Sequence, residues 1–224
     1  MSKIENMFEA GLHYGYSKTR RHPSASPFIY TTKNKVDIID LEKTESDLTS
    51  AEGFLSAMSA QGKTVLWIGV KPEAKKAIND AGMILSMPYV TERWVGGSLT
   101  NWTEVRKRIA RLIDLKNQKE TGELALKYTK KERLMIDREV AKMEKNFSGL
   151  VGMTKLPDVA VVIDPKREHI AVTELQKVNI PIIALGNTDC DMTKINYPII
   201  GNDGSVSSIK FIVEELVKAY RGKE

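Results

Sequence analysis

The chain has 224 residues, 42% of them hydrophobic and 28% charged, which is typical of a soluble globular protein with a full core. Its single cysteine, Cys190, excludes an intramolecular disulfide, and no stretch reaches the roughly 20 apolar residues that span a bilayer. Residues 1–5 carry no long apolar segment, so we expect no secretory signal.

The net charge of +5 is unevenly distributed along the chain. Residues 93–146 contain 14 Lys/Arg against 8 Asp/Glu, whereas the remainder contains 20 against 21. A smaller cluster without any acidic residue at positions 17–35 comprises Lys18, Arg20, Arg21, Lys33 and Lys35. Localised positive charge is typical of a protein with a polyanionic partner, and a solvated helix face is the alternative interpretation.

The N-terminal part predicts short elements, then a helix and a buried strand. A short helix is expected over 4–10, and short strands at 28–30 and 36–39 around a polar turn. Apolar residues recur every three or four positions within 41–60, which predicts a helix. The apolar run 64–68 predicts a fully buried parallel strand, followed by a helix over 72–81 and a short strand at 87–90.

Residues 93–149 interrupt this alternation. The stretch RWVGGSLTNW, residues 93–102, brings two tryptophans and a glycine pair to a helix start. Apolar residues at helical spacing predict one helix to about Leu115 and a second from Thr129, which opens on a capping-box pattern with Glu132. The short link between them predicts an inserted antiparallel helical hairpin, a coiled coil.

Strands and helices alternate again after the insertion. Strands are expected at 159–163, 180–185 and 197–200, and helices at 167–177 and 205–220. This order predicts an α/β fold with a doubly wound, mostly parallel sheet of flavodoxin- or Rossmann-like type. We therefore divide the chain into a core domain of residues 1–92 and 150–224, with the basic N-terminal segment, and an inserted hairpin of residues 93–149.

Catalytic motifs find little support. Residues 57–64, AMSAQGKT, resemble a phosphate loop, but they end a helix and open a strand, the reverse of the order that binds phosphate. No GxGxxG follows a strand, and neither HExxH nor GxSxG occurs. The alternative interpretation is that the core belongs to an enzyme or a ligand-binding protein. A nucleotide or sugar phosphate would then bind beyond Ile163 and Leu185.

Three aspartates follow predicted strands, at the sheet edge where ligands bind in parallel sheets. Asp189, Asp191 and Asp203, together with His13, are candidate ligands for a divalent metal ion. Turns and helix caps explain the same aspartates, and we favour that interpretation. No metal and no other cofactor is therefore assigned.

Several blocks, in order along the chain, resemble the bacterial-type ribosomal protein S-two family of the small subunit. The signature block is RWVGGSLTNW at 93–102. The other matching blocks lie at 7–15, 27–30, 34–44, 156–164, 180–185 and 197–203. Because independent blocks agree over almost the whole chain, the resemblance is more specific than any single motif.

The resemblance implies a structural, non-catalytic protein on the solvent side of the small ribosomal subunit, in the cytoplasm or in an organelle. Its implied partners are small-subunit ribosomal RNA, neighbouring ribosomal proteins and, as in many bacteria, ribosomal protein S-one, with no membrane. Tyr16, Asn187 and Gly204 stand where the family usually has histidine, aspartate and aspartate. These departures argue against a family-type metal site and the usual S-one docking surface.

Cations near the hairpin root and in the N-terminal segment are the expected RNA contacts, since phosphate contacts fix orientation and RNA shape gives selectivity. Trp94 and Trp102 are expected mainly to pack. Lys107, Arg108 and Arg111 share a broad helix face opposite the apolar stripe. The predicted contacts are Lys18, Arg20, Arg21, His22, Lys33, Lys35, Arg93, Asn101, Arg106, Lys107 and Arg108.

Overall fold

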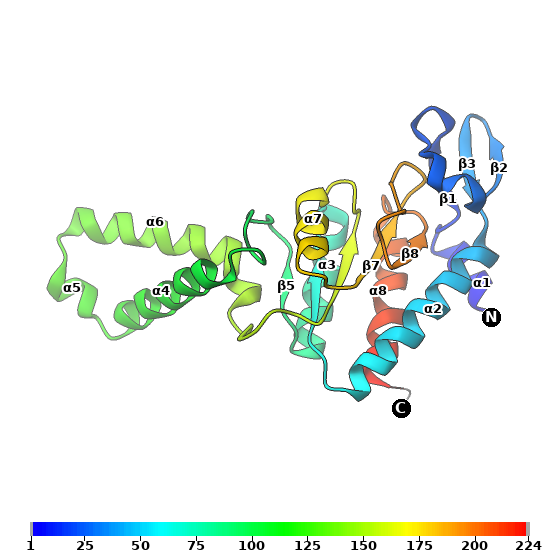
Figure 1. Ribbon diagram of the computed structural model, residues 1–224. Coiled ribbons are helices and arrows are strands. Elements are labelled where there is room, and N and C mark those ends of the chain that lie inside the picture. The colour runs from blue at the N-terminus through cyan, green and yellow to red at the C-terminus, as the bar shows by residue number, and fades with distance from the viewer. Residues whose placement is uncertain (1, 223–224) are drawn as a thin grey trace.

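The computed structural model describes residues 2–222 as two sheets with their helices and a helical hairpin projecting from one end (Figure 1). The larger sheet is entirely parallel, in the order β5-β4-β6-β7-β8. Its strands are β4 (Val65–Ile68), β5 (Tyr89–Val90), β6 (Val159–Ile163), β7 (Ile182–Gly186) and β8 (Tyr197–Ile200). Counted within this sheet the order is 2-1-3-4-5, the flavodoxin-like arrangement, so the predicted doubly wound α/β fold is confirmed.

Helices cover both faces of the parallel sheet, and its strands are therefore apolar on both sides. Val65 and Trp67 of β4 pack in one cluster with helices α2 (Leu41–Ala60), α3 (Pro72–Leu85) and α8 (Val206–Arg221). Leu66 and Ile68 point the other way and pack in a second cluster that includes α7 (His169–Lys177). Burial on both faces explains the continuous apolar runs in the sequence.

The N-terminal segment, which we call the N-terminal lobe, contains a small antiparallel sheet, β1-β3-β2, and packs against the core through Met7 and Leu12. It consists of α1 (Lys3–Glu9), β1 (Tyr14–Ser17), the 3-10 turns η1 (Lys18–Arg20) and η2 (Pro23–Phe28), β2 (Ile29–Lys33) and β3 (Val36–Ile39). Asn34 and Lys35 join β2 to β3 with φ of 50° and 64°, the positive values that a two-residue hairpin turn requires. The sequence did not predict β1, which is short, irregularly paired and without alternating apolar residues.

The inserted hairpin consists of α4 (Trp102–Glu120), the short α5 (Glu123–Lys127) and α6 (Lys130–Phe147). In Figure 1, α4 and α6 run side by side in opposite directions, away from the sheet. Val105, Ile109 and Leu112 of α4 share a buried seam with Val140 and Met143 of α6. The Thr129 capping box forms as expected, and α5 is an addition inside the predicted link. Supercoiling of the helices and the domain boundaries stay predictions.

The predicted boundaries differ from the structure at several elements, among them α3, β7 and α7. Helix α3 continues to Leu85 and stops where Ser86 takes a left-handed conformation, with φ of 52°. Strand β7 starts at Ile182, after Pro181, because proline has no N–H to donate to the ladder. Helix α7 starts at His169 rather than 167, after a turn at Asp164. None of the helices within residues 2–222 is long and apolar enough to cross a membrane.

Candidate nucleic-acid interface

The loop that begins the hairpin, residues 93–101, is held by one buried carboxylate. Glu174 of α7 accepts hydrogen bonds from the indole N–H of Trp94 at 3.1 Å and from the backbone N–H groups of Gly97 at 2.7 Å and Leu99 at 3.0 Å. Its Oε2 also accepts from the backbone N–H of Thr100, at 3.3 Å. The loop is thereby fixed to α7 before α4 begins.

A groove of about 610 Å³ lies at this root, between the loop and both long helices of the hairpin. We call it the root groove. Four cations line it: Arg93 of the loop, Arg108 and Arg111 of α4, and Lys142 of α6. Trp94, Met143 and Phe147 are buried side chains on its apolar floor. Arginine beside apolar surface suits a nucleotide, which offers a phosphate and a base face together.

The cations of the hairpin differ in how far they are already paired. Arg111 Nε lies 3.0 Å from Oε1 of Glu139, and Lys107 Nζ lies 2.6 Å from Oε1 of Glu104. Among residues 2–222, Arg93, Arg108 and Lys142 have no ion-pair partner, and all three side chains are exposed. The root groove therefore holds three positive charges that no carboxylate in the described part of the chain compensates.

The structure does not gather all the predicted hairpin contacts. Arg93 and Arg108 line the root groove, whereas Asn101, Arg106 and Lys107 are exposed outside it. Arg106 follows the buried Val105 and lies two positions before Arg108, so it projects from the other flank of α4. The three cations predicted to share one face therefore do not all reach the groove. Arg108 and Arg111 line it, whereas Lys107 lies outside it and pairs with Glu104.

The N-terminal lobe presents a second group of cations. Lys18, Arg20, Lys33 and Lys35 are exposed. Lys33 precedes the β2–β3 turn and Lys35 lies in it, and the Arg20 guanidinium lies 5.7 Å from the centre of the Tyr16 ring. Two other predicted contacts have internal partners. Arg21 Nε donates to Oδ2 of the fully buried Asp37 at 2.8 Å, and the ring of His22 caps the η2 turn through Ser24.

The aspartates considered as metal ligands are engaged in other contacts. Asp189 pairs with Lys166 at 2.7 Å, and Asp191 accepts from the backbone and hydroxyl of Thr193. His13 stacks on the ring of Phe8 at a centroid distance of 4.3 Å, and the ring of Tyr14 lies tilted against it at 4.1 Å. Within residues 2–222 no three His, Cys, Asp or Glu side chains gather as a metal would need.

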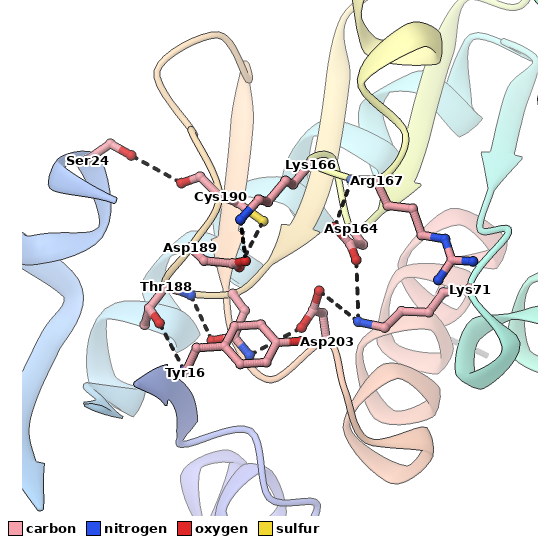
Figure 2. Close-up of polar contacts among 11 residues, drawn as sticks. Tyr16, Ser24, Lys71, Asp164, Lys166, Arg167, Thr188, Asp189, Cys190 and Asp203 are labelled. Atoms are coloured by element: carbon pink, nitrogen blue, oxygen red, sulfur yellow. Dashed lines mark hydrogen bonds and ion pairs between the residues drawn. The ribbon is translucent and has the colours of Figure 1, made fainter. Parts of the chain in front are cut away.

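Asp203 lies in a polar cluster beyond the ends of β4, β6, β7 and β8 (Figure 2). Its Oδ1 accepts from Asn187 at 3.2 Å, and its Oδ2 lies 3.1 Å from Nζ of Lys71, which also reaches Asp164 at 3.4 Å. Burial and the charge of Asp164 raise the pKa of Asp203. Burial favours the neutral form of Lys71, but Asp203 and Asp164 outweigh it and raise the Lys71 pKa. With an ammonium already between the two carboxylates, these residues do not fit a metal ion.

This cluster also bears on the ligand-binding alternative. Nucleotides bind to flavodoxin-like sheets where the strand order reverses, here between β4 and β6. Lys71 follows β4 and Asp164 follows β6, so their ion pair spans that position. The position that a phosphate would occupy is thus taken by the Lys71–Asp164 ion pair. The cation that could bind a phosphate, Lys71, is already paired with two carboxylates.

Sequence reasoning missed three residues that matter here: Glu174, Lys142 and Lys71. Glu174 lies on α7 between the buried Val172 and Leu175, and a carboxylate on a buried face signals a hidden partner. Lys142 carries no such signal, because its role depends on how α6 is rotated against α4. Lys71 follows a buried strand, yet nothing local predicts that Asp203 reaches it from the other end of the chain.

The chain is similar to known proteins over nearly its whole length. Residues 7–222 match the family described as ribosomal protein S2. A protein of Nostoc punctiforme named small ribosomal subunit protein uS2 is 40% identical over 221 residues, which cover 98% of this chain and 83% of that protein. Proteins of the same name from Synechococcus elongatus, 40% identical over 96% of this chain and 86% of theirs, and Coprothermobacter proteolyticus, 39% identical over 96% and 80%, are similar too.

Proposed function

The chain belongs to the ribosomal protein S2 family, and from this membership we propose that it binds small-subunit ribosomal RNA through two basic surfaces. Proteins of this family are structural components of the small ribosomal subunit and not enzymes. The first surface is the N-terminal lobe around the β2–β3 turn, and the second is the hairpin root with the adjoining side of α4. Other proteins of the subunit are expected neighbours, in the ribosome, which is cytoplasmic in bacteria.

The observation that carries the proposal is the concentration of cations that have no counter-ion among residues 2–222. Lys33 and Lys35 project from one turn, and Arg93, Arg108 and Lys142 surround one groove. A cation without an intramolecular partner is available to a phosphate and displaces counter-ions from RNA, so affinity falls as salt rises. Such contacts fix the orientation of the protein, while the folded shape of the RNA selects the site.

The test is incorporation into small subunits that lack this protein, measured by co-sedimentation at increasing salt. We expect the double variant Lys33→Ala/Lys35→Gly to incorporate less well, because glycine keeps the positive φ of the turn while two cations are lost. The triple variant Lys107→Glu/Arg108→Glu/Arg111→Glu should fold normally and also incorporate poorly.

The matched control is Lys76→Ala/Lys177→Ala, which removes two exposed lysines outside both surfaces. It should incorporate like the wild type. Equal incorporation of all three variants at every salt concentration would contradict RNA binding through these surfaces.

Docking of ribosomal protein S-one stays a separate prediction from the family resemblance. It would be measured by binding of purified S-one to subunits reconstituted with this chain. Because Tyr16, Asn187 and Gly204 depart from the family pattern, we expect this binding to be weak. Restoring all three family residues, by Tyr16→His/Asn187→Asp/Gly204→Asp, should strengthen it if those positions matter.

A further inference from the structure

We propose that the root groove receives a single unpaired nucleotide of RNA, with its phosphate held by Arg93, Arg108 and Lys142 and its base against the apolar floor. This inference rests on the proposed function and specifies the form of RNA that this surface takes. It is drawn from the charge, the shape and the lining of the root groove.

Charge comes first. Four cations and one carboxylate line the root groove, and the carboxylate, Glu139, is paired with Arg111. Three cations from three different segments therefore face the same space without a counter-ion within residues 2–222. A solvated helix face would need no such convergence, whereas a phosphate with two anionic oxygens accepts hydrogen bonds from several donors at once.

The shape favours an unpaired nucleotide over a double helix. The root groove is concave and its volume of about 610 Å³ is that of a small-molecule site. An RNA duplex is convex and far wider, so it would rest on the outer surface of the hairpin and leave this space empty. Unpaired nucleotides, by contrast, turn out of the RNA and insert into protein surfaces.

The lining completes the match. Trp94, Met143 and Phe147 are buried, and the small apolar surface that they leave open at the floor can contact a base. The Arg93 and Arg108 guanidinium planes can stack on a base as well as bind phosphate. The floor is also rigid, since Trp94 is hydrogen-bonded to Glu174. An acidic peptide would satisfy the cations but has no flat face for this floor, so RNA is the favoured partner.

The experiment is a fluorescence-anisotropy titration of the full chain with three labelled probes: an eight-nucleotide single-stranded RNA, a twelve-base-pair RNA duplex and a glutamate-rich peptide. We expect the single strand to bind most tightly. Arg108→Ala/Lys142→Ala should weaken its binding about tenfold or more and reduce the salt slope by about 1 to 2. The matched control Lys130→Ala/Lys131→Ala removes two exposed lysines of α6 outside the root groove and should change affinity less than about twofold.

A second variant adds binding instead of removing it. Glu139→Gln releases Arg111 into the root groove, so single-strand affinity should rise several-fold and the salt slope by about 0.7. A merely structural role for these residues would not produce this gain. The inference would be overturned if Glu139→Gln gave no gain in affinity, or if Arg108→Ala/Lys142→Ala weakened binding no more than Lys130→Ala/Lys131→Ala does. Tighter binding of the duplex or of the peptide would overturn it too.

Failure of this inference and failure of the proposed function are distinguishable. Suppose that Arg108→Ala/Lys142→Ala incorporates into subunits like the wild type while Lys33→Ala/Lys35→Gly does not. The root groove is then not an RNA-binding site, and the proposal that the chain binds ribosomal RNA is retained. If the wild-type chain does not co-sediment with small subunits at low salt, the proposed function itself fails.

Discussion

The indole N–H of Trp94 donates a hydrogen bond to Oε1 of Glu174, 80 residues away in the sequence, at 3.1 Å. With the backbone donors of Gly97, Leu99 and Thr100 on the same carboxylate, the loop forms a nest of N–H groups around an anion supplied by the chain itself. Burial alone would raise the pKa of Glu174, but these hydrogen bonds outweigh it and lower the pKa.

Replacing this carboxylate should loosen the hairpin root. We expect Glu174→Gln to lower the free energy of unfolding by about 2 to 3 kcal/mol, because an amide NH₂ would face backbone donors that need an acceptor. Urea unfolding measures the loss, and hydrogen exchange at Gly97 and Leu99 should accelerate. Thr173→Ala, one residue earlier on the exposed side of α7, is the control. Unchanged exchange in the glutamine variant would contradict the role of Glu174.

The same carboxylate gives a pH dependence. Because the pKa of Glu174 is lower in the folded state than its ordinary value of 4.5, its contribution is complete above pH 4.5 and is lost as pH falls through the folded pKa. The stability difference between wild type and Glu174→Gln should therefore shrink in acid.

Two glycines near the end of the hairpin should respond oppositely to alanine. A Cβ at Gly149 would overlap the carbonyl oxygen of Tyr89 in β5, whereas at Gly152 it would meet no atom within 4 Å. We expect Gly149→Ala to cost about 2 kcal/mol or more and Gly152→Ala to be neutral or stabilising by about 0.5 kcal/mol. Thermal unfolding of the two variants checks this, and equal melting temperatures would refute the close contact.

Arg21 should prove a structural residue of the N-terminal lobe. Its guanidinium hydrogen bond lowers the pKa of Asp37, which is fully buried, so Arg21→Ala would leave a buried charge without its partner. We expect a loss of about 3 kcal/mol, partly restored in Arg21→Ala/Asp37→Ala. The exposed Arg20→Ala is the control and should unfold like the wild type. If Arg21→Ala kept full stability and lost only RNA affinity, Arg21 would be a contact residue instead.

Glu168 should make the protein less stable as pH rises. Burial raises its pKa from 4.5 to about 7, so the folded state resists ionisation that the unfolded chain undergoes freely. The loss of folding stability that Glu168 causes is absent below pH 4.5, grows as the pH rises to about 7, and is constant above that pH. Allowing for partial solvent screening, Glu168→Gln should gain about 1 to 2 kcal/mol at pH 8 and little at pH 4. Parallel stability curves for the two proteins would contradict this.

The elements with a regular apolar pattern were predictable, because in each of them the order of apolar residues follows directly from which side chains are buried. The predicted ranges 41–60, 159–163 and 197–200 coincide with α2, β6 and β8. Burial on both faces gives such strands a continuous apolar run, and one buried stripe gives α2 its spacing. Strand β1 has neither pattern, and its pairing with β3 depends on contacts that no local window contains.

The candidate interface was predictable in part. Charge counting located the hairpin and the N-terminal cluster, but it cannot say which cations are already paired. Arg21 and Arg111 have acidic partners that only the folded chain brings near, whereas Lys107 pairs with Glu104 one turn away on its own helix. Lys142 reaches the root groove only through the rotation of α6 against α4. Pairing across the fold, not residue type, separates an available cation from an occupied one.

The tight packing of Gly149 against Tyr89 has a consequence for angular precision. Helix α6 has 18 residues and is therefore a lever of about 27 Å. A tilt of one degree at its root displaces the far end by about 0.5 Å, so small errors at Gly149 are multiplied along its length. The close packing of Gly149 against Tyr89 thus fixes the direction of α6 and, with it, the position of the far end of the hairpin.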